Sequence, residues 1–214
     1  MAFEDFTTYI ETDPNNRFSV AANAITVTAL SRDEDAWLIK DRGAGHFSGD
    51  FEHLFKYTPA TNTNRAHADL LSLANIVDDV NGIDTAAGDL LGVWYFKSDS
   101  GVNQYGLYEI VAGTPYQVDT SVTNHSVVRY PKFKRDEGVG TYGTLYLYIY
   151  SDEARTILIQ TISLTLHEKE DFRYNYVMHS YDDNNAAYTL GGVLENLDLQ
   201  EAVAVVNSNF FTFF

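Results

Sequence analysis

The stretch Gly143-Thr-Leu-Tyr-Leu-Tyr-Ile-Tyr-Ser-Asp152 decides the fold class, because apolar and amphipathic side chains alternate along it with a period of two. This period is typical of a β-strand with one face on a core, and it does not suit a helix. Leu145, Leu147 and Ile149 are expected to point into the core. The tyrosines between them are expected to form a row on the opposite face.

Similar alternation extends in both directions from this stretch. Toward the C-terminus, strands are predicted at 157–167, 172–181 and 190–199, and toward the N-terminus at 127–135, 105–111 and 90–97. Shorter strands are predicted at 18–20, 25–30, 37–40 and 50–58, with period-two alternation opening the chain at 3–10. Residues 68–75 are interpreted as a strand and 76–87 as containing a short helical turn. About a dozen strands at spacings of roughly 10–15 residues predict an all-β, antiparallel two-sheet sandwich or jelly roll.

Length and composition limit the classes of function. The chain has 214 residues, which suits one domain over residues 1–200, and its formal charge is −16. Such an acidic surface repels nucleic acid and anionic membranes. There is no cysteine, so a disulfide scaffold and cysteine-ligated metals are excluded. The first residues lack the basic and apolar stretches of a signal peptide, which predicts either retention in the cell or release by another route.

Residues 201–214 stand apart from the strand pattern. They end in Phe210-Phe-Thr-Phe-Phe214, a group of aromatic residues that would be poorly soluble if it were left in water. Two interpretations remain open. The tail packs on its own domain, or it docks on a neighbouring subunit of a homo-oligomer or larger assembly.

Five stretches in the second half resemble the concanavalin A-like lectin/glucanase superfamily, which includes laminin-G-like modules. They are 130–136 (YPKFKRD), 143–152, 157–166, 171–174 (DFRY) and 192–199 (GVLENLDL). In particular they are similar to divergent copies found in phage and metagenomic structural proteins. The first half matches more loosely, through 34–41 and 49–52. The resemblance implies a jelly roll, but this fold hosts lectins, hydrolases, lyases and structural modules alike.

The motifs of the enzymes in this superfamily are absent. Retaining glucanases carry two glutamates flanking an aspartate on one strand, and no stretch here has that spacing. Tyr95-Phe-Lys97 and Asn103-Gln-Tyr105 are similar to pieces of an alginate-lyase strand, but Ser98 to Val102 separate them, which indicates a hairpin. No catalytic residue is therefore assigned, and the chain is expected not to be an enzyme.

Metal binding receives two interpretations. His46 and His53 could share a site with Asp50, although scattered histidines on β proteins are more often ordinary packed or exposed residues. Calcium is the cation that lectin-like loops hold, and the candidate loops are 182–185, 78–84 and Asp13 with Asn15. Because Asx side chains also cap their own turns, turn chemistry is the preferred interpretation, and no metal or other cofactor is assigned.

The tyrosine row is the best candidate binding surface. Tyr146, Tyr148 and Tyr150 share one face of their strand, and Arg173 and Tyr174 are expected beside them on a paired strand. Tyrosine rings stack on sugar faces while their hydroxyls form hydrogen bonds, and such a row equally suits a protein interface. A third interpretation is that a loop covers the row.

The leading hypothesis is a non-enzymatic structural or adhesion module on the surface of a virion, as a capsid decoration or fibre-like protein with glycan binding. Its partners would be a glycan or a capsid or assembly protein, and it would be extracellular after release. The alternatives are a stand-alone soluble lectin or carbohydrate-binding module and a polysaccharide-degrading enzyme.

Overall fold

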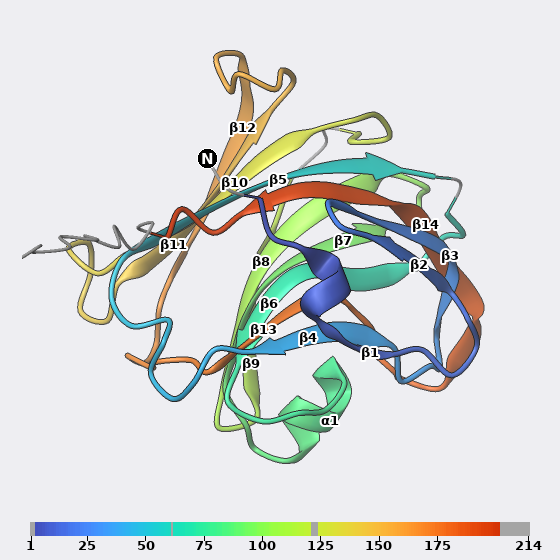
Figure 1. Ribbon diagram of the computed structural model, residues 1–214. Helices are drawn as coiled ribbons and strands as arrows, with labels where there is room; N and C mark the ends of the chain where they lie inside the picture. The colour runs from blue at the N-terminus through green and yellow to red at the C-terminus, as the bar shows by residue number, and fades with distance from the viewer. Residues whose placement is uncertain (1–2, 61, 121–123, 202–214) are drawn as a thin grey trace, which may run out of the picture.

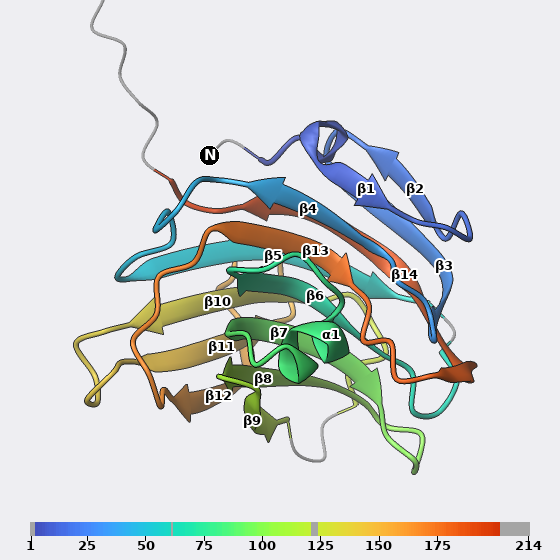
Figure 2. The same ribbon diagram turned by 90° about the horizontal axis from the view of Figure 1, so that it is seen from below.

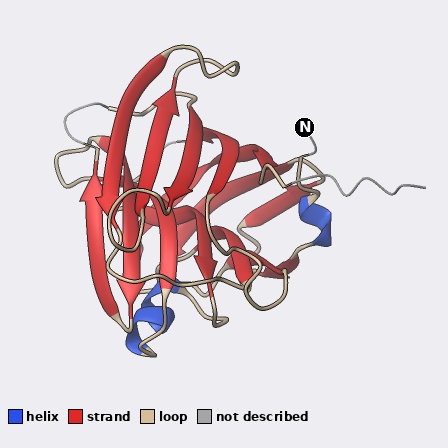
Figure 3. Ribbon diagram, turned by 90° about the vertical axis from the view of Figure 1, so that its left-hand side faces the viewer, coloured by secondary structure: helices blue, strands red, loops and turns tan. Residues whose placement is uncertain are grey.

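Two antiparallel sheets of seven strands each pack face to face in the computed structural model, which describes residues 3–60, 62–120 and 124–201 (Figure 1). Helix is scarce in the described chain, which holds one short 3-10 helix (Phe6–Thr8) and one short α-helix, α1 (Val80–Thr85). Figure 3 shows the two layers of strands with these helices at their margins. The sandwich predicted from the alternation is confirmed.

Sheet A holds the strands that lie next to α1. Its order is β1 (Ile10–Thr12), β4 (Trp37–Asp41), β13 (Tyr174–His179), β6 (His67–Ala74), β7 (Leu90–Lys97), β8 (Asn103–Val111) and β9 (Thr114–Asp119). The β7–β8 hairpin places residues 98–102 in its turn, as the spacing of the two motif fragments predicts.

Sheet B holds the decisive stretch and its neighbours. Its order is β12 (Leu158–Thr165), β11 (Thr144–Tyr150), β10 (Tyr130–Asp136), β5 (Phe51–Pro59), β14 (Asn185–Asp198), β3 (Ala24–Arg32) and β2 (Phe18–Ala21). Strands far apart in sequence thus become neighbours, since β10 lies between β5 and β11.

The core lies between the sheets and contains the apolar half of each alternation. Leu145, Leu147 and Ile149 are fully buried, and Phe55 and Phe133 join them from β5 and β10. Burying a side chain of this size stabilises the fold by roughly 1.5–3 kcal/mol relative to leaving it exposed. The inward direction predicted for alternate residues of β11 is confirmed.

A second apolar cluster joins α1 to sheet A. Figure 2 shows α1 lying against the outer face of that sheet. Val80 and Ile83 of the helix pack with Leu90 and Tyr176 of the sheet. Asp79 caps the helix, because its Oδ1 accepts hydrogen bonds from the backbone N–H groups of Asn81 and Gly82. The strand and helical turn predicted within 68–87 are confirmed, although α1 has only six residues.

Two local features differ from what the alternation predicts, and one prediction falls outside the described residues. The chain opens with the 3-10 turn at Phe6–Thr8 rather than a strand, because Asp5 accepts hydrogen bonds from Thr7. The alternation analysis also missed β9, where Pro115 and polar residues weaken the strand pattern. The predicted tail lies outside the described residues apart from Glu201.

Candidate functional site

The tyrosine ladder, Tyr146, Tyr148 and Tyr150 of β11, lies on the outer face of sheet B. Each of the three is partly exposed, while the residues between them point into the core. The rings of Tyr146 and Tyr148 stack with centroids 5.9 Å apart and planes 19° apart. The described chain therefore leaves part of each tyrosine open to solvent, and no described segment covers the row completely.

Strand β10 lines the ladder with a second row of polar side chains. Its register places Tyr130 opposite Tyr150 and Lys132 opposite Tyr148. The Lys132 ammonium lies 4.9 Å from the centroid of the Tyr148 ring, which is within cation–π range. This contact holds the Tyr148 ring in place, and the aliphatic part of the Lys132 side chain lies along the outer face of the sheet.

Every lysine along this face has an acidic partner. Lys56 lies 2.7 Å from Glu195, Lys132 3.4 Å from Glu52, and Lys134 2.8 Å from Asp136. The hydrogen bond from Lys134 lowers the pKa of Asp136, and the same contact raises the pKa of Lys134. Such paired charges leave little net field at the surface, which favours ligands with many hydroxyl groups over strongly charged ones.

A pocket adjoins the ladder at Tyr150, and we call it the Tyr150 pocket. Its volume is about 360 Å³, within the range of small-ligand sites. Strands β5, β10, β11 and β14, the N-terminal segment and the β11–β12 loop all contribute to its lining, which comprises Phe3, Glu52, Leu54, Lys56, Tyr130, Lys132, Tyr150, Glu153, Ala154, Arg155, Asn196 and Asp198. The lining combines aromatic rings with side chains that donate and side chains that accept hydrogen bonds.

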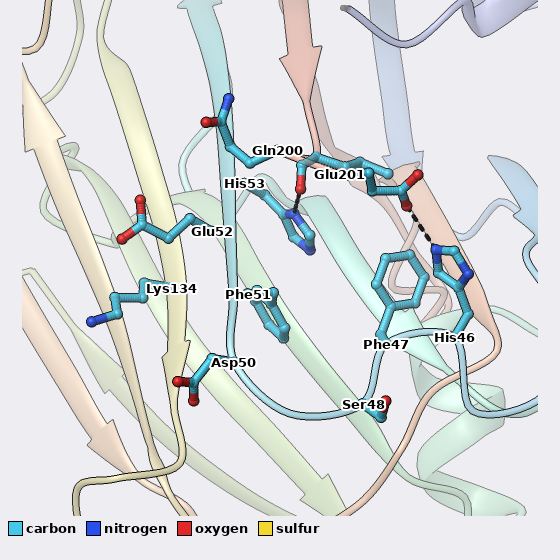
Figure 4. A pocket seen from close by; sticks show the side chains of 11 residues that line it. His46, Phe47, Ser48, Asp50, Phe51, Glu52, His53, Lys134, Gln200 and Glu201 are labelled. Atoms are coloured by element: carbon cyan, nitrogen blue, oxygen red, sulfur yellow. Dashed lines mark hydrogen bonds and ion pairs between the residues drawn. The ribbon is translucent and has the colours of Figure 1, made fainter. Parts of the chain in front are cut away.

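Figure 4 shows a second pocket, the His53 pocket. Glu52 lines both this pocket and the Tyr150 pocket. The volume of the His53 pocket is about 490 Å³. It lies beside the first residues of β5, beyond the point where β14 ends and no longer pairs with β5. His46, His53 and Asp50 all line it, but among the described residues they are not close enough together to share an ion, so the metal site that sequence analysis weighed for them is not formed.

The chemistry of His53 argues against a catalytic role in this pocket. Burial lowers its pKa to about 4, so the ring is neutral at pH 7. The ring stacks on Phe51 with centroids 4.5 Å apart, and Nδ1 lies 3.2 Å from the carbonyl oxygen of Leu199. A fully buried ring wedged between aromatic side chains acts as a packed core residue.

The acidic cluster that most resembles a cation site lies elsewhere. Within the described chain, Asp35, Asp79 and Asp182 are the acidic or histidine side chains close enough to share an ion, with ligand atoms within 4.8 Å of one another. Two of them come from loops that sequence analysis proposed separately for calcium. Burial, together with the charges of Asp78 and Asp35, raises the pKa of Asp79 to about 7.

Two of the predicted ligand residues do not join the ladder. Arg173 and Tyr174 belong to the region of β13, which pairs with β4 and β6 in sheet A. Arg173 forms an ion pair with Asp41 at 2.5 Å, which lowers the pKa of that carboxyl group to about 2, and its guanidinium lies over the Tyr174 ring. The expectation that they flank the tyrosine row is wrong, because β10 and β12 are the neighbours of β11.

Sequence analysis also did not assign Tyr130, Lys132 and Glu52 to the binding surface, although they line the Tyr150 pocket. We call this pocket and the tyrosine ladder together the groove. Tyr130 and Lys132 entered the sequence analysis only within the motif 130–136, and Glu52 only within the looser match at 49–52. The alternation within β5 and β10 does predict that these side chains point away from the core. What was lacking was the pairing of β10 with both β5 and β11, which is a long-range property.

Comparison with known proteins gives results at the level of structure. The sequence matches no known family model and no curated protein. The structure of the alginate lyase Aly36B is similar over 90% of this chain and 86% of that one, with a TM-score of 0.55 at 13% identity. A legume lectin-like domain from Entamoeba histolytica is similar over 92% of this chain and 97% of its own length, with a TM-score of 0.55 at 9% identity.

A phage protein shows the same likeness over part of its length. Tailspike protein 2 from the Escherichia coli O157:H7 bacteriophage CAB120 matches 92% of this chain but 26% of its own, with a TM-score of 0.51 at 11% identity. Together with the two seven-stranded sheets, these similarities show that the chain has a concanavalin A-like jelly-roll fold. The described residues include no helix long and apolar enough to span a membrane.

Proposed function

We propose that this protein is a non-catalytic carbohydrate-binding module whose ligand lies along the tyrosine ladder and enters the Tyr150 pocket. The observation that carries the proposal is the ladder itself, a row of three partly exposed tyrosines on the outer face of a sheet, two of them stacked, next to a pocket of about 360 Å³. Sugar rings present apolar C–H faces to aromatic rings, and their hydroxyl groups bond to polar side chains at the ring edges. The groove offers both kinds of contact.

The paired charges of the face support neutral sugar units as ligands. Lys132 and Glu52 can donate and accept hydrogen bonds beside Tyr148 without adding net charge. The chain as a whole carries −16, which opposes the approach of polyanionic chains at low ionic strength.

The carboxylates of the groove support a binding role over a catalytic one. Asp50 accepts a 2.7 Å hydrogen bond from the backbone N–H of Glu137, and Glu52 is paired with Lys132. A general acid needs a carboxyl group that stays protonated near neutral pH. Burial raises the pKa values of Asp69 and Asp79, and these two residues line neither pocket.

The setting proposed for this module is the surface of a particle, as a capsid decoration or fibre-like protein that is extracellular after release. The phage tailspike that shares the fold supports this setting, as does the sequence resemblance to phage structural proteins. A stand-alone lectin is the second candidate, supported by the lectin-like domain that matches along its whole length.

A glycan array tests the binding function. We expect the wild-type protein to bind a set of neutral oligosaccharides and Tyr148→Ala to bind at least about fivefold more weakly, because one aromatic contact contributes about 1 kcal/mol beyond its buried area. Tyr174→Ala is the matched control, since Tyr174 is a partly exposed tyrosine of the opposite sheet. Loss of binding in the control with retention in Tyr148→Ala would refute the site.

Incubation with alginate and β-glucans tests the absence of catalysis. We expect neither new reducing ends nor unsaturated products over hours at micromolar protein. Product formation that is lost on boiling would refute the non-catalytic part of the proposal and favour the enzyme alternative.

A further inference from the structure

Arg155 differs from the other cations that line the Tyr150 pocket. Lys56 and Lys132 each have a carboxylate partner, whereas no described carboxylate forms an ion pair with Arg155. Its guanidinium bonds to two backbone carbonyl oxygens, with Nη1 donating to Glu153 at 3.3 Å and Nη2 to Phe55 at 2.9 Å. A guanidinium has five N–H donors, so most of the donors of Arg155 have no acceptor in the described chain.

The surroundings of Arg155 make an unpaired charge costly. Burial lowers the pKa of its guanidinium, although the nearby carboxylates of Glu153 and Asp198 act in the opposite direction. Nε is shielded from solvent and has no hydrogen-bond acceptor among the described residues. A charge that has lost part of its water without gaining a counter-ion is unfavourable, and an anion that binds to it removes part of this cost. The pocket therefore lacks one negatively charged acceptor.

The loop between β11 and β12, residues 151–157, fixes the position of Arg155. The backbone of Arg155 has a φ of 53°, in the left-handed region that residues other than glycine rarely adopt. Asp152 stabilises this turn, because its Oδ1 accepts hydrogen bonds from the N–H groups of Thr156 at 3.1 Å and Ile157 at 2.7 Å. Its carbonyl oxygen also accepts from the N–H of Arg155 at 3.0 Å. Strained backbone that several bonds hold in place is concentrated at binding and catalytic sites.

The remaining charges of the pocket do not exclude an anion. Its lining holds three cationic side chains and three carboxylates, namely Lys56, Lys132, Arg155, Glu52, Glu153 and Asp198. Asp198 accepts hydrogen bonds from the backbone and the side chain of Gln200, and Glu52 is paired with Lys132. The lining thus has no net formal charge, although the chain carries −16. At about 0.15 M salt the Debye length is about 8 Å, so distant charges act only weakly on a ligand in the pocket.

We propose that Arg155 binds an oxyanion, a carboxylate or a sulfate or phosphate ester, carried by the one sugar unit that enters the Tyr150 pocket. The inference rests on the proposed function, in which the tyrosine ladder binds the neutral units of the same ligand. The planar fork of a guanidinium matches two oxygens of such a group, and hydrogen bonds between charged partners are stronger than neutral ones. Arg155 is then the residue that selects a ligand with a single acidic unit over a wholly neutral one.

Matched oligosaccharides test this selectivity. Cellotetraose, mannotetraose and xylotetraose would each be compared with forms that carry one glucuronic acid unit, one sulfate ester or one phosphate ester, by calorimetry in about 0.15 M salt. We expect the wild-type protein to bind at least one charged form about tenfold more tightly than its neutral parent. We expect Arg155→Gln to lose this gain and to bind the neutral parent within about twofold of the wild type, which also shows that the variant is folded.

Arg65→Gln is the matched control. It removes the same charge from an exposed arginine that precedes β6 in sheet A and lines neither the Tyr150 pocket nor the His53 pocket. We expect this variant to keep the full preference for the charged form. Arg155→Lys, which keeps the charge but not the fork, should keep part of it.

The outcomes separate this inference from the proposed function. Charged forms that bind no more tightly than the neutral parent, or a gain that persists in Arg155→Gln, would overturn the inference and leave neutral-sugar binding standing. A gain that depends on Arg155 but is unaffected by Tyr148→Ala would support the inference and contradict the role of the ladder. Absence of binding to every form at millimolar sugar would overturn both.

Discussion

The acidic cluster next to α1 gives the sharpest prediction for stability. Asp79 is only 7% exposed, and its side chain caps the helix through Oδ1. The substitution Asp79→Asn keeps this acceptor and removes the charge that lies close to Asp35 and Asp182. We therefore expect the variant to be more stable than the wild type at neutral and alkaline pH.

The size of the effect follows from the pKa of Asp79, which burial raises from 3.8 to about 7. The folded state binds the proton more tightly than the unfolded state, so the wild type loses stability as pH rises from about 4 to about 7. A pKa raised by about three corresponds to a loss of at most about 4 kcal/mol in the free energy of unfolding at high pH. Because Asp35 is exposed and solvent screens the cluster, we expect about 2 kcal/mol, or a melting temperature raised by roughly 4–8 °C.

Thermal unfolding at pH 4 and pH 8, with a chelator present so that no divalent cation offsets the charges, measures this difference. We expect the two proteins to melt within about 1 °C of each other at pH 4, with the gap opening at pH 8. Equal stability at pH 8 would refute the reasoning. A gap of the same size at both pH values would show that the amide stabilises the cap by itself.

Three further predictions concern other parts of the fold. Burial lowers the pKa of His179 to about 3, so unfolding at pH 5 is accompanied by proton uptake that lowers the stability of the wild type by about 2 kcal/mol. In urea titrations, His179→Gln should therefore lose less stability than the wild type between pH 7 and pH 5. Gly106→Ala would place its Cβ 1.3 Å from Nε1 of Trp94, so the variant should lose about 3 kcal/mol or more, whereas Gly138→Ala in an exposed turn should stay within about 1 kcal/mol. Asp152 accepts hydrogen bonds from the N–H groups of Thr156 and Ile157, so Asp152→Ala should speed amide exchange in the β11–β12 loop without changing global stability by more than about 1 kcal/mol.

The fold class could be predicted because it depends on a local property. Alternation with a period of two fixes which side chains of β11 point inward, and Leu145, Leu147 and Ile149 are indeed fully buried. The same parity placed the tyrosines outward. A single strand with one apolar face carries this information without knowledge of its neighbours.

The composition of the site could not be predicted fully because it depends on strand order. β13 follows β12 in sequence, which suggested that Arg173 and Tyr174 lie beside the ladder. The chain instead crosses to sheet A after β12, and β10 and β5 supply the polar side chains. Pairing between strands some 80 residues apart leaves no local signal.

The convergence of Asp35, Asp79 and Asp182 has the same origin. Each lies in a loop or cap whose Asx residues suit turn chemistry, and the sequence separates them by more than 40 and more than 100 positions. Backbone hydrogen bonds of Ser180 with Ala36 and with Val80 join the three segments, and the carboxylates come within 4.8 Å of one another.

The most direct test of glycan binding on sheet B is to map where a bound sugar lies. Protein labelled with carbon-13 in its aromatic rings would be titrated with the neutral oligosaccharide that binds best on the array, and ring chemical shifts would be followed. We expect the resonances of Tyr146, Tyr148 and Tyr150 to move with one saturable affinity. Shifts confined to Trp37 and Trp94, on the outer face of sheet A, would contradict the proposed site.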